Sequence, residues 1–164
     1  MRGKKILIDG IGSGLDIPHL APQAQYIGLD LTRAMLKRAR RSAAIEGKDI
    51  TLHQGDAMRL PYQDAQFDAV IMHLILAIVP HPERALAEAE RVLKPGGLIV
   101  ILDKFLRPGQ WAPVRRLISP LLGRIATRTN VVFEDVLRHC PQLKVVHDVA
   151  LSFGWFRRIV VRKD

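Results

Sequence analysis

Cysteine is almost absent from this sequence, since its 164 residues include only Cys140. One thiol cannot form an intramolecular disulfide, and no residues around it have metal-ligand spacing. Aromatic residues are also scarce, at 5% of the chain, so few rings are available to stack on bases. The first absence excludes a disulfide scaffold or a cysteine-bound metal and suits a reducing, cytoplasmic setting. The second makes nucleic acid an unfavoured partner.

Long apolar runs are missing as well. The longest nearly uninterrupted one, residues 69–79, contains His73 and is too short to span a bilayer. Near the N-terminus, Asp9 interrupts an apolar run after three residues, which is far too short for a secretory signal peptide. Hydrophobic residues still make up 48% of the chain, enough for a core. We therefore expect a single domain over residues 1–164, soluble or at most peripheral to a membrane.

Acidic residues are outnumbered, with 16 against 25 basic ones, and the net charge is +9. The basic residues concentrate in two segments, residues 33–48 and residues 104–133, and the second contains no acid. Such a field attracts anionic partners, either nucleic acid or the headgroups of anionic lipids. A solvated basic surface that only keeps the protein soluble explains the charge equally well.

Short apolar segments alternate with helix-like ones along the chain, which is typical of an α/β fold. Several of the apolar segments are continuous, which indicates strands covered on both faces and hence a mostly parallel sheet. Five strands are predicted at residues 5–9, 25–30, 50–54, 67–72 and 98–102. A closing pair of strands is predicted at residues 144–149 and 156–162.

Three helices are predicted between these strands. The first has Thr32 as its N-cap and Gly47 as its stop. The second begins at Pro82 and leads through a turn at residues 94–97 into the fifth strand, and a short third helix covers residues 134–139. The predicted inner stripes are Met35, Ala39 and Ala43 in the first helix and Leu86, Ala89 and Leu93 in the second.

The segment from residue 105 to residue 130 breaks this regularity with prolines and glycines, and its apolar residues are interleaved with arginines. This basic amphipathic character predicts a cover over the carboxyl edge of the sheet, on the side where a substrate binds in such folds. Its arginines are suited to contact with anionic membrane lipid.

Glycines and acids follow the predicted strands, at the edge where parallel α/β sheets bind their ligands. After the first strand, glycines at positions 10, 12 and 14 let a ligand approach the backbone. Their G-x-G-x-G spacing differs from the dinucleotide pattern G-x-G-x-x-G. Asp30, at the second strand's end, can accept two hydrogen bonds from a ribose diol, and Asp56, at the third strand's end, one from an exocyclic amine. The acids favour a nucleoside site over a purely structural glycine turn.

In this order, the motifs resemble the class I S-adenosylmethionine-dependent methyltransferases, over nearly the whole chain. The matching segments are Ile6–Gly14, Tyr26–Asp30, His53–Ala57, Leu60–Pro61, Phe67–Val70 and Arg91–Gly97. Gly12–Pro18 and Val79–Pro82 are most similar to the small-molecule branch, which includes ubiquinone/menaquinone biosynthesis C-methyltransferases and bacterial phosphatidylethanolamine N-methyltransferases. The resemblance implies a Rossmann-like fold with a doubly wound, mostly parallel, seven-stranded sheet.

The resemblance further implies S-adenosylmethionine as cofactor and S-adenosylhomocysteine as its product, with transfer of the methyl group to a small-molecule or lipid-like acceptor by in-line displacement. Within the implied set, the glycine turn lines the methionine portion, Asp30 holds the ribose, and Leu31 and Met35 pack near the adenine. Met35 at helical spacing fits a core role as an alternative. The implied cofactor-binding residues are Asp9, Gly10, Gly12, Ser13, Gly14, Asp30, Leu31, Met35, Gly55, Asp56, Ala57, His73 and Leu74.

Two strand-end residues are candidates for catalysis. His73 follows the fourth predicted strand and Asp103 follows the fifth. If the acceptor must lose a proton, His73 is the first candidate for the general base and Asp103 the second, on strand-end position alone. A packing role for His73 is an equally good interpretation.

Two departures from the family pattern bear on the site. Family members usually carry the first-motif acid two residues before the first glycine, where this chain has Ile8, and the acid here is Asp9. A shift by one residue turns a strand side chain to the opposite face, which leaves the methionine amino group to backbone or water. Relatives also usually carry a few tens of residues before the first strand, whereas five precede Ile6 here. In relatives this segment often forms helices that cover the substrate. Its shortness here predicts an open site, a site closed by the second subunit of a homodimer, or a truncated chain.

Three other functions stay open at this point. A binding or scaffold protein could keep the fold without competent catalysis, as the displaced acid allows. An RNA-directed methyltransferase is suggested by the charge, but no Asn-Pro-Pro-Tyr-like run follows the fourth predicted strand. A nicotinamide-dependent dehydrogenase is a remote fourth reading.

Overall fold

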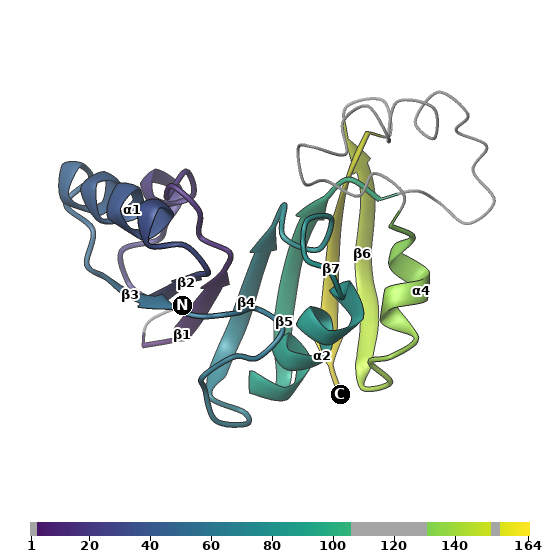
Figure 1. Cartoon of the computed structure of the whole chain (residues 1–164). Coiled ribbons are helices and arrows are strands. Elements are labelled where there is room, and N and C mark those ends of the chain that lie inside the picture. Colours follow the sequence, from purple (N-terminus) through teal and green to yellow (C-terminus); the bar gives the residue numbers. More distant parts are fainter. Residues whose placement is uncertain (1–2, 106–130, 152–154) are drawn as a thin grey trace, which may run out of the picture.

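The computed structural model describes residues 3–105, 131–151 and 155–164, so the predicted cover segment lies almost wholly outside the described residues. One seven-stranded sheet runs through the molecule in the order β3-β2-β1-β4-β5-β7-β6 (Figure 1). Neighbouring strands from β3 to β5 are parallel, whereas β7 is antiparallel to both β5 and β6. This confirms the predicted, mostly parallel sheet. The strands are β1 (Lys5–Asp9), β2 (Gln25–Asp30), β3 (Ile50–Gln54), β4 (Phe67–His73), β5 (Leu93–Asp103), β6 (Leu143–Leu151) and β7 (Phe156–Lys163).

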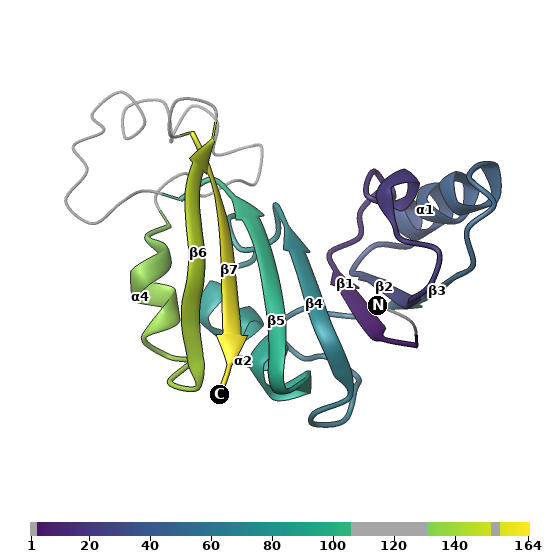
Figure 2. The ribbon, with the colours of Figure 1, turned by 180° about the vertical axis from the view of Figure 1, so that it is seen from behind.

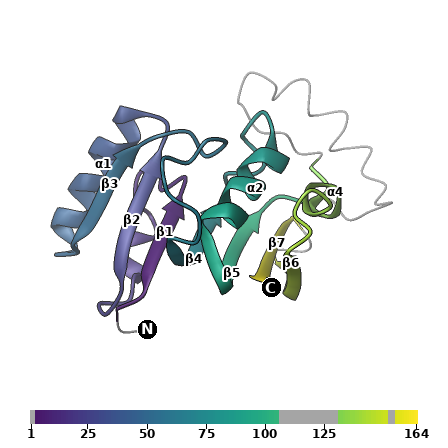
Figure 3. The same ribbon diagram turned by 90° about the horizontal axis from the view of Figure 1, so that it is seen from below.

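Helices pack on both faces of the sheet, as the apolar clusters on either side of β1 show. Successive residues of β1 belong to different clusters. Leu7 lies in the larger cluster, which includes the inner residues of α2, while Ile6 and Ile8 lie in the smaller one with α1. Figure 3 shows α1 beside β2 and β3, and α2 and α4 over the other half of the sheet. The helices are η1 (Ile17–His19), α1 (Arg33–Ile45), α2 (Pro82–Val92) and α4 (Phe133–Leu137), of which η1 is a single 3₁₀ turn.

The fifth strand begins earlier than predicted. The sequence pattern placed its start at Leu98, but β5 begins at Leu93, directly after α2. Its register against β4 shifts between the pairs Phe67 with Leu93 and Ala69 with Leu98, so residues 94–97 form an irregularity within the strand. The residues predicted as a turn therefore lie within β5 but are not paired with β4, and Gly96 among them has a left-handed φ of 76°.

Helix α1 begins and ends close to its predicted boundaries. Thr32 holds the N-cap position, but its side chain makes no capping hydrogen bond and instead donates to Asp30. The helix ends at Ile45, and Gly47 adopts a left-handed φ of 59°, the conformation expected just beyond a helix end. The start of α1 is thus tied to the end of β2.

One face of the half-sheet formed by β4, β5, β7 and β6 has no described helix in front of it (Figure 2). Leu98 and Val149, on β5 and β6, are exposed there. Among the helices of residues 3–105, 131–151 and 155–164, none has the length and apolar character needed to cross a bilayer.

Candidate active site

The ends of four parallel strands meet at one edge of the sheet, as the sequence predicted. The residues that follow three of these strands are tied to a neighbouring strand by a backbone hydrogen bond: Gly10 N–H donates to Leu29, Gly55 N–H to Asp30, and Leu74 N–H to Leu102. These bonds fix the loops that leave β1, β3 and β4. The structure therefore brings the predicted glycine turn and strand-end acids together along a single edge.

The three glycines of the turn after β1 serve different purposes, although all have positive φ. A Cβ at Gly10 would lie 2.7 Å from Ile75, and one at Gly14 would lie 2.6 Å from Ile17 and 3.0 Å from the Cα of Ala39. Packing inside the protein requires these two glycines. A Cβ at Gly12 would meet only a carbonyl oxygen at 4.0 Å, so the backbone there faces open space. Gly12 is consequently the place where a ligand can approach the chain.

Asp30 organises this turn from the end of β2. One carboxylate oxygen accepts a hydrogen bond from the Gly12 N–H at 3.0 Å, and the other accepts from the Thr32 N–H at 2.9 Å and its hydroxyl at 3.0 Å. The side chain is half-buried, so part of its surface stays accessible. Each carboxylate oxygen can accept more than one hydrogen bond, so a diol can still bind there.

Leu31 and Met35 form an exposed apolar surface beside Asp30. Leu31 is 64% exposed and Met35 36% exposed, whereas Ala39 on the same helix is fully buried. The alternative in which Met35 belongs to the core is therefore wrong. Gln54 at the end of β3 donates a hydrogen bond to the Leu31 carbonyl and accepts one from Arg33, which holds this corner in place.

Asp56 lies in the turn that follows β3. Its carboxylate accepts a hydrogen bond from the Met58 N–H at 2.8 Å, and its carbonyl accepts one from the Arg59 N–H. Asp56 and Gly55 are half-buried, and Ala57 is buried in the larger apolar cluster. Ala57 can therefore offer its backbone but not its side chain to a ligand.

Arg91 on α2 anchors the loop that follows Asp56. Its guanidinium donates to the carbonyls of Leu60 and Tyr62 and pairs with Glu88 at 2.8 Å, while Glu88 accepts a hydrogen bond from the Leu60 N–H. The side-chain hydrogen bond from Arg91 is the main reason that the pKa of Glu88 is lowered. This network fixes the loop, and with it the position of Asp56, relative to α2.

Asp9 does not line the open edge, although the resemblance placed it in the cofactor set. Asp9 is fully buried and lies on the face of the sheet that α2 covers. Neither of its carboxylate oxygens has a hydrogen-bond partner among the described residues. Burial raises its pKa from 3.8 to about 7, and the charges of Asp56, Asp30 and Glu88 add to this effect. The physical reason is its strand position, because side chains one residue apart point to opposite faces.

Asp103, the second candidate base, is also buried, with 1% exposed. Its carboxylate accepts hydrogen bonds from the Ala77 N–H at 3.0 Å and the Lys104 N–H at 2.7 Å. Burial raises the pKa of Asp103, and these backbone hydrogen bonds oppose the rise. Asp103 is placed to anchor the loop after β4. Leu74, the first residue of that loop, is 46% exposed and has a positive φ of 55°, unusual for a residue other than glycine.

His73 reaches the site from the end of β4 and meets a residue that sequence reasoning missed. Its Nδ1 lies 3.0 Å from Oδ1 of Asp16, and the two side chains are 29% and 30% exposed. Asp16 directly precedes η1 in the loop that contains the glycines, and Ser13 is half-buried in the same loop. Nothing in the local pattern around Asp16 points to His73, because the pair is separated by 57 positions.

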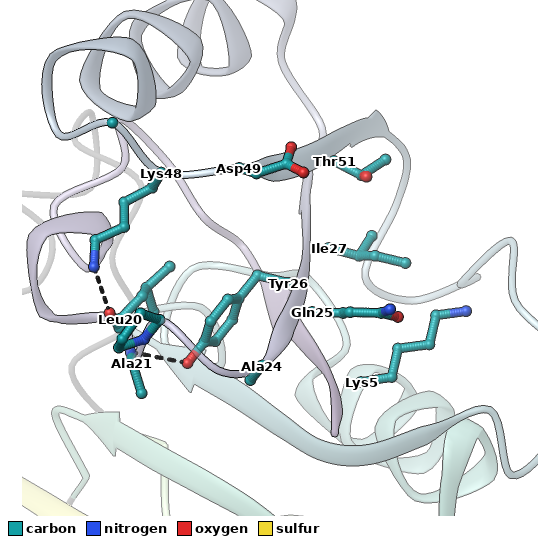
Figure 4. Close-up of a pocket in the computed structure, with 12 residues that line it drawn as sticks. Lys5, Leu20, Ala21, Ala24, Gln25, Tyr26, Ile27, Lys48, Asp49 and Thr51 are labelled. Carbon is teal, nitrogen blue, oxygen red and sulfur yellow. Dashed lines mark hydrogen bonds between the residues drawn. The ribbon is translucent and has the colours of Figure 1, made fainter. Parts of the chain in front are cut away.

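A separate hollow lies at the opposite edge, where β1 and β2 begin (Figure 4). It has a volume of about 680 Å³. Figure 4 shows the hydrogen bond that the Lys48 ammonium donates to the Leu20 carbonyl and the one that the Ala21 N–H donates to the Tyr26 hydroxyl. The hollow contains none of the strand-end acids. The carboxyl edge is therefore the better candidate for chemistry.

The match to the Methyltransferase domain model covers residues 8–101, more than half of the chain, and this chain belongs to that family. It is 32% identical over 156 residues to a phosphatidylethanolamine N-methyltransferase of Cereibacter sphaeroides, which covers 93% of this chain and 76% of that enzyme. It is 37% identical over 103 residues to a demethylmenaquinone methyltransferase of Deinococcus radiodurans, covering 61% of this chain and 43% of that enzyme. The chain thus matches less than half of the second relative's length.

The solved structures agree on the fold. A crystal structure of a SAM-dependent methyltransferase from Methanosarcina mazei superimposes with a TM-score of 0.76, covering 99% of this chain and 93% of that one at 19% identity. The Rossmann-like methyltransferase fold predicted from the sequence is confirmed.

Proposed function

We propose that this chain binds S-adenosylmethionine along the carboxyl edge of β1 to β4 and transfers its methyl group to a small, lipid-like acceptor. The observation that carries the proposal is the arrangement around Gly12. Its backbone faces open space, and the carboxylate of Asp30 lies next to it at the neighbouring strand end. Within a methyltransferase-domain protein, this open backbone beside a half-buried acid suits the methionine and ribose portions of the cofactor.

The other residues of the edge suit the remaining parts of that cofactor. Leu31 and Met35 offer an exposed apolar surface for a flat adenine ring, and Asp56 can accept a hydrogen bond from its amino group. Backbone hydrogen bonds to β2 hold Gly10 and Gly55 at the same edge. The fit depends on residues from three separate strands, which a structural glycine turn alone does not require.

The main task of the protein in this reaction is to align the acceptor atom with the S–CH₃ bond of the cofactor. S-adenosylmethionine supplies a methyl group on a positively charged sulfur, which is already a good electrophile. His73 and Leu74 border the place where the acceptor must stand, and His73 is the residue we assign as base if the acceptor loses a proton. Asp103 supports this place by holding the backbone of the loop after β4.

A lipid acceptor is favoured over a nucleic acid. The relative aligned over most of the chain is named a phosphatidylethanolamine N-methyltransferase. Exposed apolar side chains stand close to the site, with Leu15 83% exposed and Leu31 64% exposed. Such side chains suit an acyl chain or membrane surface better than a polar RNA backbone.

The basic face of α1 suits contact with an anionic membrane. The helix contains five basic residues and no acid, and no ion pair joins them to a carboxylate in the described part of the chain. Sedimentation with vesicles of phosphatidylcholine, with and without phosphatidylglycerol, tests this contact. Binding that requires the anionic lipid and decreases with salt supports it. The homodimer and the cytoplasmic location expected from the sequence stay predictions.

Calorimetry with S-adenosylmethionine, followed by a methyl-transfer assay, tests the main proposal. The acceptors to compare are phosphatidylethanolamine vesicles, a quinone extract and total RNA. Cofactor binding with methylated lipid or quinone supports the proposal. Binding without transfer to any acceptor favours the catalytically incompetent binding protein, and methylated RNA favours the nucleic-acid enzyme. A chain that binds a nicotinamide dinucleotide instead is not a methyltransferase.

A further inference from the structure

Asp16 and His73 form a pair between two loops of the candidate site. Oδ1 of Asp16 lies 3.0 Å from Nδ1 of His73, within hydrogen-bonding distance. Both side chains are about one third exposed, so the pair is accessible from solvent and is not a buried structural ion pair. A hydrogen bond between these two atoms needs the ring proton on Nδ1, because an ionised carboxylate can only accept.

Backbone contacts hold both partners of the pair in place. On the Asp16 side, the Ile17 N–H donates to Gly14 and the His19 N–H donates to Asp16, which closes the 3₁₀ turn. On the other side, His73 is in register with Leu102 of β5, and the next N–H donates to that same residue. The pair is therefore built into the framework of the site, and its geometry does not depend on a long flexible side chain.

The backbone at Leu74, directly after His73, adopts a conformation that is unusual for a residue other than glycine. A non-glycine residue in the left-handed region carries backbone strain, and such residues cluster at active sites and ligand-binding loops. Leu74 follows His73 directly, with a φ of 55° and 46% of its surface exposed. The strained position therefore lies next to the histidine, with the Leu74 side chain partly open to solvent.

We propose that Asp16 is a positioning residue for His73 in methyl transfer. Asp16 holds the imidazole with its proton on Nδ1, so that the lone pair of Nε2 is presented to the acceptor. As the acceptor atom bonds to the methyl carbon, the S–CH₃ electron pair remains on sulfur, and His73 Nε2 takes the proton that the acceptor loses. The Asp16 carboxylate balances the resulting imidazolium charge. This inference rests on the proposed function and adds a residue to it.

Asp16→Asn is the informative variant, because it keeps the size of the side chain and changes its hydrogen bonding. The amide can donate to Nδ1, which would move the ring proton to Nε2 and remove the base. We expect kcat to fall at least about tenfold, with the affinity for S-adenosylmethionine and the KM of the acceptor changed less than about twofold. Asp16→Glu restores a carboxylate and should recover part of kcat. Asp49→Asn is the matched control, because that exposed acid lies at the opposite edge of the sheet.

The tautomer of His73 provides a readout that needs no activity. Long-range ¹H–¹⁵N spectra of the neutral imidazole should show the proton on Nδ1 in the wild-type protein and a shift toward Nε2 in Asp16→Asn. An unchanged kcat together with an unchanged tautomer overturns the inference, as does a loss of kcat accompanied by an equal loss of cofactor affinity. If the wild-type protein methylates no acceptor, the proposed function fails, and the spectra still decide whether Asp16 orients His73.

Discussion

The substitution Asp9→Asn is expected to stabilise this protein at neutral and alkaline pH. Asp9 is fully buried at the end of β1, and its two carboxylate oxygens have no hydrogen-bond partner in the described part of the molecule. Burial of an uncompensated charge disfavours the ionised form, so the protein must either keep the carboxyl protonated or lose stability. Asparagine has nearly the same shape and cannot ionise, so it removes this conflict.

The magnitude follows from the pKa of Asp9, which burial raises from 3.8 to about 7. Between these two values the folded protein binds one more proton than the unfolded chain, so the free energy of unfolding falls as pH rises. The slope is about 1.4 kcal/mol per pH unit, and the total loss is about 4 kcal/mol, complete once pH exceeds the folded-state pKa. Protonation of this group therefore stabilises the protein at low pH, and ionisation removes that contribution.

Urea unfolding at about pH 5 and about pH 8 measures the effect, because the difference between the two variants cancels all other titrating groups to first order. We expect the stability of Asp9→Asn relative to wild type to be about 3 kcal/mol more favourable at the higher pH. Any constant cost of burying the amide cancels in this comparison. Asp49→Asn, an exposed acid, should show no such dependence. A relative stability of Asp9→Asn that is the same at both pH values would refute the reasoning.

Three further predictions concern the candidate site and the helix beside it. Asp30→Ala should weaken S-adenosylmethionine binding by about 1.5–3 kcal/mol, measured by calorimetry, because a charge-assisted acceptor is lost; unchanged affinity excludes the ribose assignment. Gly12→Ala should lower the free energy of unfolding by roughly 1–2 kcal/mol because of its positive φ, and it should block cofactor binding. Gly10→Ala should mainly lower Tm, because its new Cβ would clash with Ile75. Lys37→Gln should raise Tm, since it removes like-charge contacts at i±4 worth about 0.2–0.5 kcal/mol each, yet weaken sedimentation with anionic vesicles. A stabilised variant that still sediments as well as wild type contradicts the membrane role of α1.

The part of the fold that the sequence predicts well is the half containing the site. The predicted bounds of β1, β2 and β3 agree with the structure, because each is a short β-favouring segment that ends at an acid or directly before a glycine. The edge at which Gly12, Asp30 and Asp56 meet follows from those bounds, since parallel strands end on the same side. The start of β5 was misplaced because Pro95 and two glycines are typical of a turn, whereas the strand begins before them, with Leu93 paired to Phe67 of β4.

Contacts between loops could not be predicted in the same way. The approach of Asp16 to His73 depends on the length of the turn after β1 and on the position of η1, neither of which has a repeating pattern. The exposure of Met35 could not be predicted either, because helical spacing places it on the same stripe as Ala39, which is fully buried.

The alternation of side chains along the strands separates four predicted site residues at strand ends into two groups with different tasks. Asp9 shares its face of β1 with Leu7, and Asp103 shares its face of β5 with Ile99 and Ile101, so both point into the apolar cluster under α2. Asp30 and His73 stand one residue out of phase with the cluster members Leu29 and Met72, on the face that also holds α1. Strand-end position alone makes these four residues equivalent. The face on which each side chain lies distinguishes them: Asp9 and Asp103 are buried under α2 and support the structure, whereas Asp30 and His73 can contact a ligand. For this reason we expect Asp9→Asn to affect stability first and Asp30→Ala to affect cofactor binding first.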